Sequence, residues 1–407
     1  MISFPGTWAR RQRSIVILLV LAALAFMAGS FIPPLLIWSI KPIPAGVSAE
    51  FHTEPAYTVA VDPSALENRT ASEANLDRPE CRDTAFKDLP FSCLVTEGES
   101  FQTRITTTSQ TADDEEINVD SVIKANVFGY EVAEFQDHVR LESRSAYPVA
   151  EPASSLTMSI PGVPSGIESE LFVREGLQYF FPFTLERRSY EFFDVLAQEP
   201  VALDYVGETN RNGHDAYEFH QTITAVSTRE AAARAFLQPT SITSPQLASG
   251  EVLFNQLSVE QQDLISGYTF SGPASRFYSE EELERFDYGV EDTVVVEPFY
   301  SVSRTVWVEP SSGIILDGTE NRHVYLAADV QEAEALAFDP SRAHALYLGE
   351  NTWDQQTLDI QRAAADEVVG ELRALQIFSY LAKALAFLLI LGTVTLILRN
   401  RTQQAAS

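Results

Sequence analysis

Two long apolar segments, one near each end of the chain, constrain what this sequence can fold into. The second, Ile377–Leu398, holds 22 residues with a single charge at Lys383. As a helix at about 1.5 Å per residue it spans roughly 33 Å, enough to cross a hydrocarbon core of about 30 Å. A boundary at Lys383 would leave roughly 22 Å, so we place Lys383 inside the span with its stem reaching the outer interface. The pattern predicts a transmembrane helix over 377–398.

The first apolar segment, Ile15–Ile40, holds 26 uncharged residues behind an Arg-rich start. A cleaved signal peptide begins in the same way. An uncleaved anchor is favoured because the apolar run continues to Trp38 and the best-placed cleavage site would put bulky Phe26 at its −3 position. We predict a transmembrane helix over 15–40, kinked or ended near the outer face by Pro33 and Pro34.

The charge distribution orients these anchors. All 57 acidic residues lie between Lys41 and Leu375, together with 22 of the 28 basic ones, whereas both outer flanks carry arginine and no acid. By the positive-inside rule, residues 1–14 and 399–407 are cytoplasmic and the acidic middle is outside the plasma membrane. Such an acidic domain disfavours nucleic acid as a partner. We interpret the charge as a solvated surface, with divalent-cation binding as the sharper alternative.

The two cysteines, Cys81 and Cys93, lie in this outer segment. Outside the cytoplasm such a pair predicts a disulfide rather than a metal site, since no further Cys or His stands nearby at zinc-ligand spacing. The acidic run 113–116 predicts a solvated loop rather than a calcium site, because it lacks the spacing of an EF-hand loop. We predict no metal and no cofactor.

Hydrophobic periodicity divides the outer segment. Residues 41–100 mix Pro, Asp, Glu and Ser and predict a stalk or peripheral region with one short strand at 57–61. Residues 101–352 predict a β-rich core with helical insertions, and 353–376 an amphipathic helix leading into the second anchor. The strands with the clearest period of two are 101–109, 117–128, 130–143, 201–207, 216–226, 293–296, 301–309, 314–316 and 322–327. Capping-box spacing predicts helices after Ser227 and Ser279.

An aromatic concentration follows the first strands. Its members are Tyr179, Phe180, Phe181, Phe183, Tyr190, Phe192 and Phe193. Ordinary core packing explains such a run, and the functional interpretation is one wall of an apolar ligand cavity. We predict these seven residues as a ligand-binding set and keep the core interpretation beside it.

The common catalytic motifs are missing from the sequence. It contains no G-x-S-x-G, no phosphate-binding glycine loop, no H-E-x-x-H and no C-x-x-C, and its six histidines are scattered. We therefore predict that the protein is not an enzyme, with an envelope hydrolase or transferase as the weaker alternative.

Several stretches resemble a known family. Residues 181–190 read FPFTLERRSY, 192–194 read FFD, 204–207 read DYVG and 307–315 read WVEPSSGII. Together with the two-anchor layout, they resemble the actinobacterial PorA-like envelope family. The chain departs from that pattern at Phe192-Phe193, where Trp-Trp is typical, and at Leu185, where Thr is typical. The resemblance implies an antiparallel β-barrel-like ectodomain similar to class B scavenger receptors, with helices at one end and an apolar cavity. We therefore expect an α+β fold between two transmembrane helices.

Relatives of this kind are tied to lipoglycan or glycolipid maturation. The resemblance thus implies an ectodomain that binds a membrane lipid or glycolipid and presents it to envelope biosynthesis proteins. A scaffolding protein without lipid binding is the alternative. A pore is weaker, because a membrane β-barrel satisfies its backbone by closure and needs no helical anchors.

Overall fold

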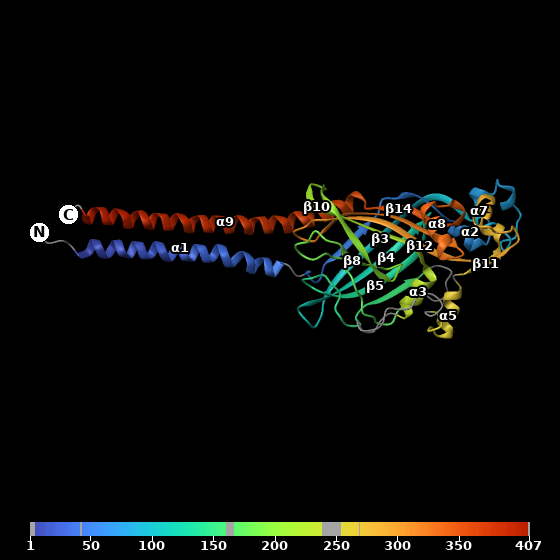
Figure 1. Cartoon of the computed structure of the whole chain (residues 1–407), viewed down its shortest axis with the longest axis horizontal. Coiled ribbons are helices and arrows are strands. Elements are labelled where there is room, and N and C mark those ends of the chain that lie inside the picture. The colour runs from blue at the N-terminus through green and yellow to red at the C-terminus, as the bar shows by residue number, and fades with distance from the viewer. Residues whose placement is uncertain (1–4, 41–42, 160–166, 238–253, 268, 406–407) are drawn as a thin grey trace. The chain divides into compact units, whose positions relative to one another are not determined.

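The computed structural model describes residues 5–40, 43–159, 167–237, 254–267 and 269–405 (Figure 1). They fall into a helical unit, formed by the two ends of the chain, and a sheet unit, formed by residues 43–363. The helical unit contains apolar helices from both ends, and the sheet unit contains a large antiparallel sheet with short helices. The predicted α+β fold class is confirmed.

Two long helices contribute to the helical unit, α1 (Pro5–Ile40) and α9 (Gln355–Ala405). Both are long and apolar enough to cross a membrane, judged by length and composition. Their apolar side chains are widely exposed, as for Phe31 at 68% and Phe387 at 65%. A lipid environment would cover such surfaces. The predicted amphipathic helix and second anchor are parts of one uninterrupted helix, α9.

Pro33 and Pro34 lie inside α1, where the sequence predicts a kink or an end. Pro33 has no N–H to bond the carbonyl of Gly29, four residues earlier. The hydroxyl of Ser379 on α9 donates to that carbonyl at 2.7 Å. A side chain of the neighbouring helix thus satisfies the freed carbonyl, and α1 continues to Ile40.

The sheet of the sheet unit has 14 strands and curls into a half-barrel (Figure 1). Its order is β7-β6-β5-β4-β3-β2-β14-β13-β12-β10-β9-β8, with β1 paired to β3 and β11 to β12. The strands are β1 (Ser48–His52), β2 (Ala56–Val61), β3 (Val95–Gln110), β4 (Glu116–Val127), β5 (Tyr130–Glu142), β6 (Ser155–Ser159), β7 (Ile167–Glu168), β8 (Tyr190–Asp194), β9 (Glu199–Arg211), β10 (His214–Ser227), β11 (Phe270–Pro273), β12 (Thr293–Val308), β13 (Ile315–Ala327) and β14 (Ala345–Thr352). The beginning and end of the unit meet where β2 pairs with β14.

The predicted strands occupy the right segments, and several of them are longer than predicted. The turn between β4 and β5 is Phe128-Gly129, both at positive φ, as two-residue hairpins require. The strands predicted at 293–296 and 301–309 are one strand, β12. Pro298 breaks the pattern in the sequence, but it lies between the ends of β10 and β11 along one side of β12. Proline is tolerated where a strand lacks a neighbour.

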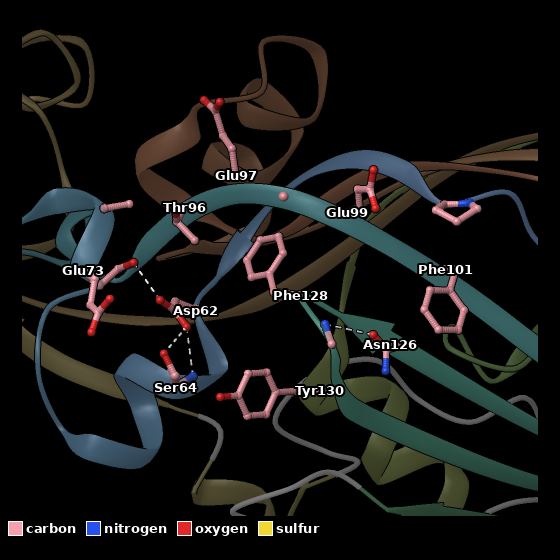
Figure 2. Close-up of a pocket in the computed structure, with 15 residues that line it drawn as sticks. Asp62, Ser64, Glu73, Thr96, Glu97, Glu99, Phe101, Asn126, Phe128 and Tyr130 are labelled. Atoms are coloured by element: carbon pink, nitrogen blue, oxygen red, sulfur yellow. Dashed lines mark hydrogen bonds between the residues drawn. The ribbon is translucent and has the colours of Figure 1, made fainter.

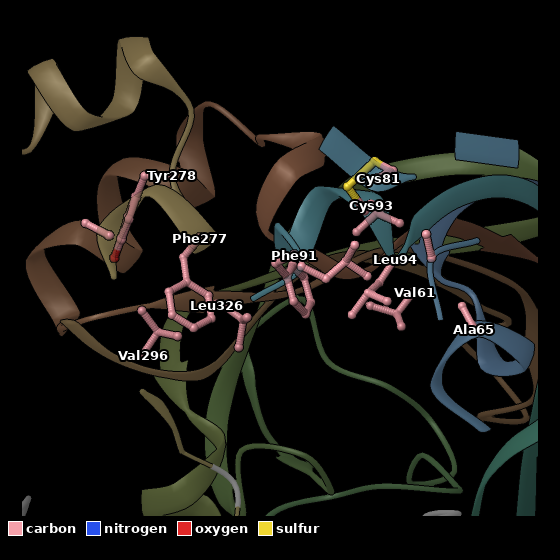
Figure 3. Close-up of a cluster of buried hydrophobic side chains, with 14 of the residues drawn as sticks. Val61, Ala65, Cys81, Phe91, Cys93, Leu94, Phe277, Tyr278, Val296 and Leu326 are labelled. Carbon is pink, nitrogen blue, oxygen red and sulfur yellow. A yellow bond between two sulfur atoms is a disulfide. The ribbon is translucent and has the colours of Figure 1, made fainter. Parts of the chain in front are cut away.

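Residues 43–100, from the segment 41–100 predicted as a stalk or peripheral region, belong to the sheet unit. Its strand β2 lies between β3 and β14, and β1 extends the same surface beside β3. Cys81 and Cys93 form the predicted disulfide. Both sulfurs lie in a buried apolar cluster with residues from distant segments, including Phe277 (Figure 3). Apolar partners from far along the chain therefore cover part of this otherwise polar segment.

The sheet has two faces that the strand register defines. Arg304 of β12 pairs with Glu320 of β13. Arg322 of β13 pairs with Gly349 of β14, Gly349 pairs with Thr58 of β2, and Thr58 pairs with β3. Paired residues of neighbouring strands point to the same side of the sheet, so these positions share one face. We call it the inner face. The outer face of β12 and β13 is covered by α8 (Val330–Phe338), which packs on Phe299 and Tyr325.

Short helices complete the sheet unit. In the described part of the unit, those of four or more residues, besides α8, are α2 (Pro63–Asn68), α3 (Thr228–Phe236), α5 (Val259–Ser266), α6 (Ala274–Phe277) and α7 (Glu280–Arg285). Ser227 caps α3 by accepting from the N–H of Glu230, and Ser279 starts α7 with a full capping box. Both predicted helix starts are confirmed.

Candidate functional site

Three of the seven predicted ligand-binding residues lie in one aromatic cluster on the inner face. The Phe181 ring lies 5.7 Å from that of Phe219, 6.1 Å from Tyr190 and 6.2 Å from Phe192, between centroids. Phe181 and Tyr190 are buried in this cluster, whereas Phe192 is half-buried. Half-buried Phe180 packs against the same cluster. Phe181 and Tyr190 therefore serve as core, and the half-buried rings of Phe180 and Phe192 are the ones that can contact a ligand.

The other predicted residues lie apart from these rings. The Tyr179 hydroxyl donates to Asp137 at 2.5 Å, and burial raises the pKa of this phenol well above its usual value. Phe193 packs against Phe172, with ring centroids 6.2 Å apart. Phe183 is half-buried and is not a member of the aromatic cluster. The role of the seven residues as one ligand-binding set stays a prediction.

A turn after β12 holds the aromatic run in place. The Leu185 N–H donates to the carbonyl of Pro310 at 2.8 Å. Gly313 has φ +75°, and a Cβ there would lie 2.5 Å from the carbonyl oxygen of Phe181. The Glu309 carboxylate accepts the N–H and hydroxyl of Ser312, each at 2.6 Å. Two stretches that carry the family resemblance therefore support each other in space.

A second feature of the inner face is a belt of charged side chains, some buried and some half-buried. We define this charged belt as Arg104, Asp137, Arg174, Asp194, Arg304, Glu320 and Arg322. At its centre, Arg304 lies 2.6 Å from the Asp194 carboxylate, their side chains being 8% and 2% exposed. Arg304 also donates to Gln221 at 2.8 Å. Tyr300 donates to the same Asp194 oxygen at 3.1 Å.

Glu320 links two arginines of the belt. One of its oxygens lies 3.0 Å from Nε of Arg304, and the other 2.6 Å from Nη2 of Arg322. Burial alone would raise the pKa of the Glu320 carboxyl, but the two guanidinium groups lower that pKa to about 2. Both oxygens of this carboxylate are therefore engaged.

Asp137 and Arg174 form a separate pair in the belt, both side chains being fully buried. The two guanidinium nitrogens reach the two carboxylate oxygens at 2.6 and 2.8 Å, a bidentate geometry. The Phe193 ring covers the Arg174 guanidinium, 4.4 Å from centroid to carbon. Both carboxylate oxygens of Asp137 are engaged as well.

Arg104 is the belt member without such a partner. It lies on β3, and its guanidinium carbon is 4.1 Å from the centre of the Phe51 ring and 5.8 Å from that of Tyr179. Its buried Nε has no hydrogen-bond partner, and no side chain in the described part of the chain pairs with its guanidinium. Burial lowers the pKa of the Arg104 guanidinium, and the charges of Tyr179 and Glu320 act in the opposite direction. The group stays charged at any physiological pH.

An open groove of about 770 Å³ lies elsewhere on the sheet unit (Figure 2). Its lining includes Asp62, Glu73, Glu97 and Glu99 beside the rings of Phe101, Phe128 and Tyr130, with no Lys or Arg and none of the seven predicted residues. Two of the carboxylates have partners. Asp62 caps α2 and Glu97 pairs with Arg342. Such a lining repels anions, in contrast to the charged belt.

The sequence interpretation missed the belt. Arg304 stands in a row of alternate residues that is otherwise apolar, including Val302 and Val306. A charge on the buried side of a period-two strand is the signal that could have indicated it. Within the described residues, no three His, Cys, Asp or Glu side chains gather as a metal-binding group.

Comparisons with known proteins agree with the resemblance. The family model described as Porin PorA matches residues 15–395. A protein named Porin PorA from Corynebacterium resistens (strain DSM 45100 / JCM 12819 / GTC 2026 / SICGH 158) is 25% identical over 413 aligned residues, covering 96% of this chain and 98% of that protein. A protein with the same name from Corynebacterium amycolatum is 25% identical over 338 residues, covering 80% of this chain and 81% of that protein.

Proposed function

This chain belongs to the Porin PorA family, and we propose that it is an envelope protein whose sheet unit binds an amphiphilic lipid or glycolipid. Family membership and the two terminal apolar helices identify a membrane protein. The proposed role is to hold such a lipid for the biosynthesis or transport of envelope lipoglycan. It is a binding role, with envelope biosynthesis proteins as partners and no catalytic step.

The observation that carries this proposal is the amphiphilic character of the inner face. Half-buried rings, including Phe192, Tyr205 and Tyr217, pack along the aromatic cluster and offer apolar contact to a hydrocarbon chain. The charged belt adjoins them, since the Arg304 guanidinium carbon lies 5.8 Å from the Phe192 ring centre. A molecule with an apolar chain and a polar head matches both zones at once.

The proposed location is the outer side of the plasma membrane. In the sequence, arginines precede the first apolar run and follow the second. By the positive-inside rule this favours cytoplasmic termini. The Cys81–Cys93 disulfide supports the same orientation, because cytoplasmic thiols are kept reduced.

The relatives' name raises pore formation as a second candidate. The path of described strands ends at β7 and at β8, which are not paired with each other. A sheet with open edges cannot satisfy its backbone inside lipid, so this half-barrel is a poor membrane pore. A channel would need the helices of several chains instead. Planar bilayer recording on the purified chain tests this candidate.

A photoreactive lipid tests the binding proposal. The full chain is placed in nanodiscs that contain a diazirine-labelled phospholipid, illuminated, digested and mapped by mass spectrometry. Labels on α1 and α9 report the bilayer and serve as the internal control. We expect additional labels on the inner face of β8 to β10, and labels confined to α1 and α9 would refute lipid binding by the sheet unit and favour a scaffold.

A pair of variants localises the labels. Phe192→Ala removes a half-buried ring of the inner face and should reduce labelling of β8 to β10 severalfold. Phe338→Ala removes a ring that is 85% exposed on α8 and should leave that labelling unchanged.

A further inference from the structure

Arg104 is a half-buried cation whose Nε is enclosed and has no hydrogen-bond partner. Removing a charge from water costs several kcal/mol unless a partner compensates it. The chain has 57 acidic residues for such compensation, yet in its described part none lies within ion-pair distance of Arg104. A half-buried charge without an ion-pair partner marks a candidate binding position.

The neighbouring carboxylates are already engaged. Glu320 influences Arg104 electrostatically, but its oxygens contact Arg304 and Arg322. Asp137 on β5 is held by Arg174. Asp194 is held by Arg304 and by a tyrosine hydroxyl. The belt thus holds four guanidinium groups and three carboxylates, an excess of one positive charge inside a strongly acidic protein.

The geometry leaves the donor edge of Arg104 free. The Phe51 ring packs on the face of the guanidinium, which leaves the in-plane N–H groups able to donate. Guanidinium N–H groups match the oxygens of phosphate and carboxylate in a bidentate arrangement. A neutral head group would leave the charge uncompensated.

We propose that Arg104 is the head-group position of the inner face and binds one anionic oxygen group, phosphate or carboxylate, of the bound amphiphile. This inference rests on the proposed function, because the anion is taken to belong to a lipid held on the same face. The same chemistry could come from a free anion, so the test separates the two sources.

The test uses native mass spectrometry of the full chain in a neutral detergent. It is titrated with phosphatidylglycerol, phosphatidylcholine and diacylglycerol of identical acyl chains, and with inorganic phosphate as competitor. We expect the wild-type chain to bind phosphatidylglycerol about tenfold or more tightly than diacylglycerol, as a charge-assisted hydrogen bond provides. Millimolar phosphate should displace little lipid.

Three variants assign that preference to one residue. Arg104→Met should lose the preference for the anionic lipid while keeping diacylglycerol affinity, and Arg104→Lys should retain part of it. Arg285→Met removes an exposed arginine of α7 and should change neither affinity. Circular dichroism confirms that each variant folds. If Arg104→Met does not fold, the wild-type preference and the Arg104→Lys variant still decide whether Arg104 sets the preference for the anionic lipid.

The outcomes are distinguishable from failure of the proposed function. Absence of binding for all three lipids would refute the proposed function itself. Binding without charge preference, or a preference that survives in Arg104→Met, would overturn the role of Arg104 alone. Loss of lipid to millimolar phosphate would overturn the lipid head group as the source of the anion.

Discussion

The hydroxyl of Ser379 on α9 donates to the carbonyl of Gly29 on α1 at 2.7 Å, at the one carbonyl that Pro33 deprives of its helical partner. Gly29 also allows the helices to approach, since a Cβ there would lie 2.8 Å from Cβ of Ala382. Small residues and side-chain donors are how membrane helices associate.

Ser379→Ala should weaken the association of α1 with α9 by about 1 kcal/mol, because the Gly29 carbonyl is left without a donor in an apolar environment. Gly29→Val should do so more strongly through steric overlap. Thermal unfolding of the full chain in detergent measures both. Thr395→Val is the matched control, since its hydroxyl bonds the carbonyl of Gly392 on its own helix. Equal stability of Ser379→Ala and Thr395→Val would contradict the assignment.

Asp194→Asn should destabilise the sheet unit by about 3 kcal/mol or more. The variant leaves the Arg304 guanidinium, 8% exposed, without one of its two carboxylates. Denaturant unfolding followed by tryptophan fluorescence measures the loss. Asp204→Asn changes an exposed carboxylate of β9 that accepts a hydrogen bond from Ser189, and we expect a change within about 0.5 kcal/mol. A small effect at Asp194 would mean that the belt relaxes around the missing charge.

Stability should fall as the pH is lowered from about 6.5 to 4, and His323 should cause part of that fall. Burial, and secondarily the charge of His344, lower the pKa of His323 to about 4. The unfolded chain then binds the proton more readily across this window, so acid favours unfolding, by at most about 3 kcal/mol. Neither ring nitrogen has a hydrogen-bond partner in the described residues.

His323→Leu should therefore flatten the dependence of unfolding free energy on pH between 6.5 and 4. His138→Leu replaces a side chain that is 33% exposed on β5 and should leave the slope there largely intact. Denaturant titrations at half-unit pH intervals provide the comparison. An unchanged slope in His323→Leu would assign the acid sensitivity to other groups.

Membrane topology can be tested with single added cysteines, because both native cysteines are in a disulfide. The outer permeability barrier of the cells is opened while the plasma membrane is kept intact. An impermeant maleimide should then label Ala112→Cys and not Thr402→Cys. Permeabilising the plasma membrane should expose the second site. The reverse pattern would place the sheet unit in the cytoplasm.

The sequence by itself determined the features whose energetics are local. The two apolar segments are long enough to span a membrane, Ser227 and Ser279 cap helices, and Cys81 pairs with Cys93. Each depends on residues a few positions apart, so propensity and spacing suffice to predict it. The aromatic run was also visible, although its division into buried and half-buried rings was not.

Tertiary structure decided which distant residues meet. Residues 43–100 join the sheet unit because β2 pairs with β14 from the other end of that unit. Ser379 completes a hydrogen bond for Gly29, 350 positions earlier. Arg104 is left unpaired because strand register brings Glu320 to Arg304 and Arg322 instead. Charge compensation between strands depends on register and on the curl of the sheet, and no local pattern in the chain encodes either.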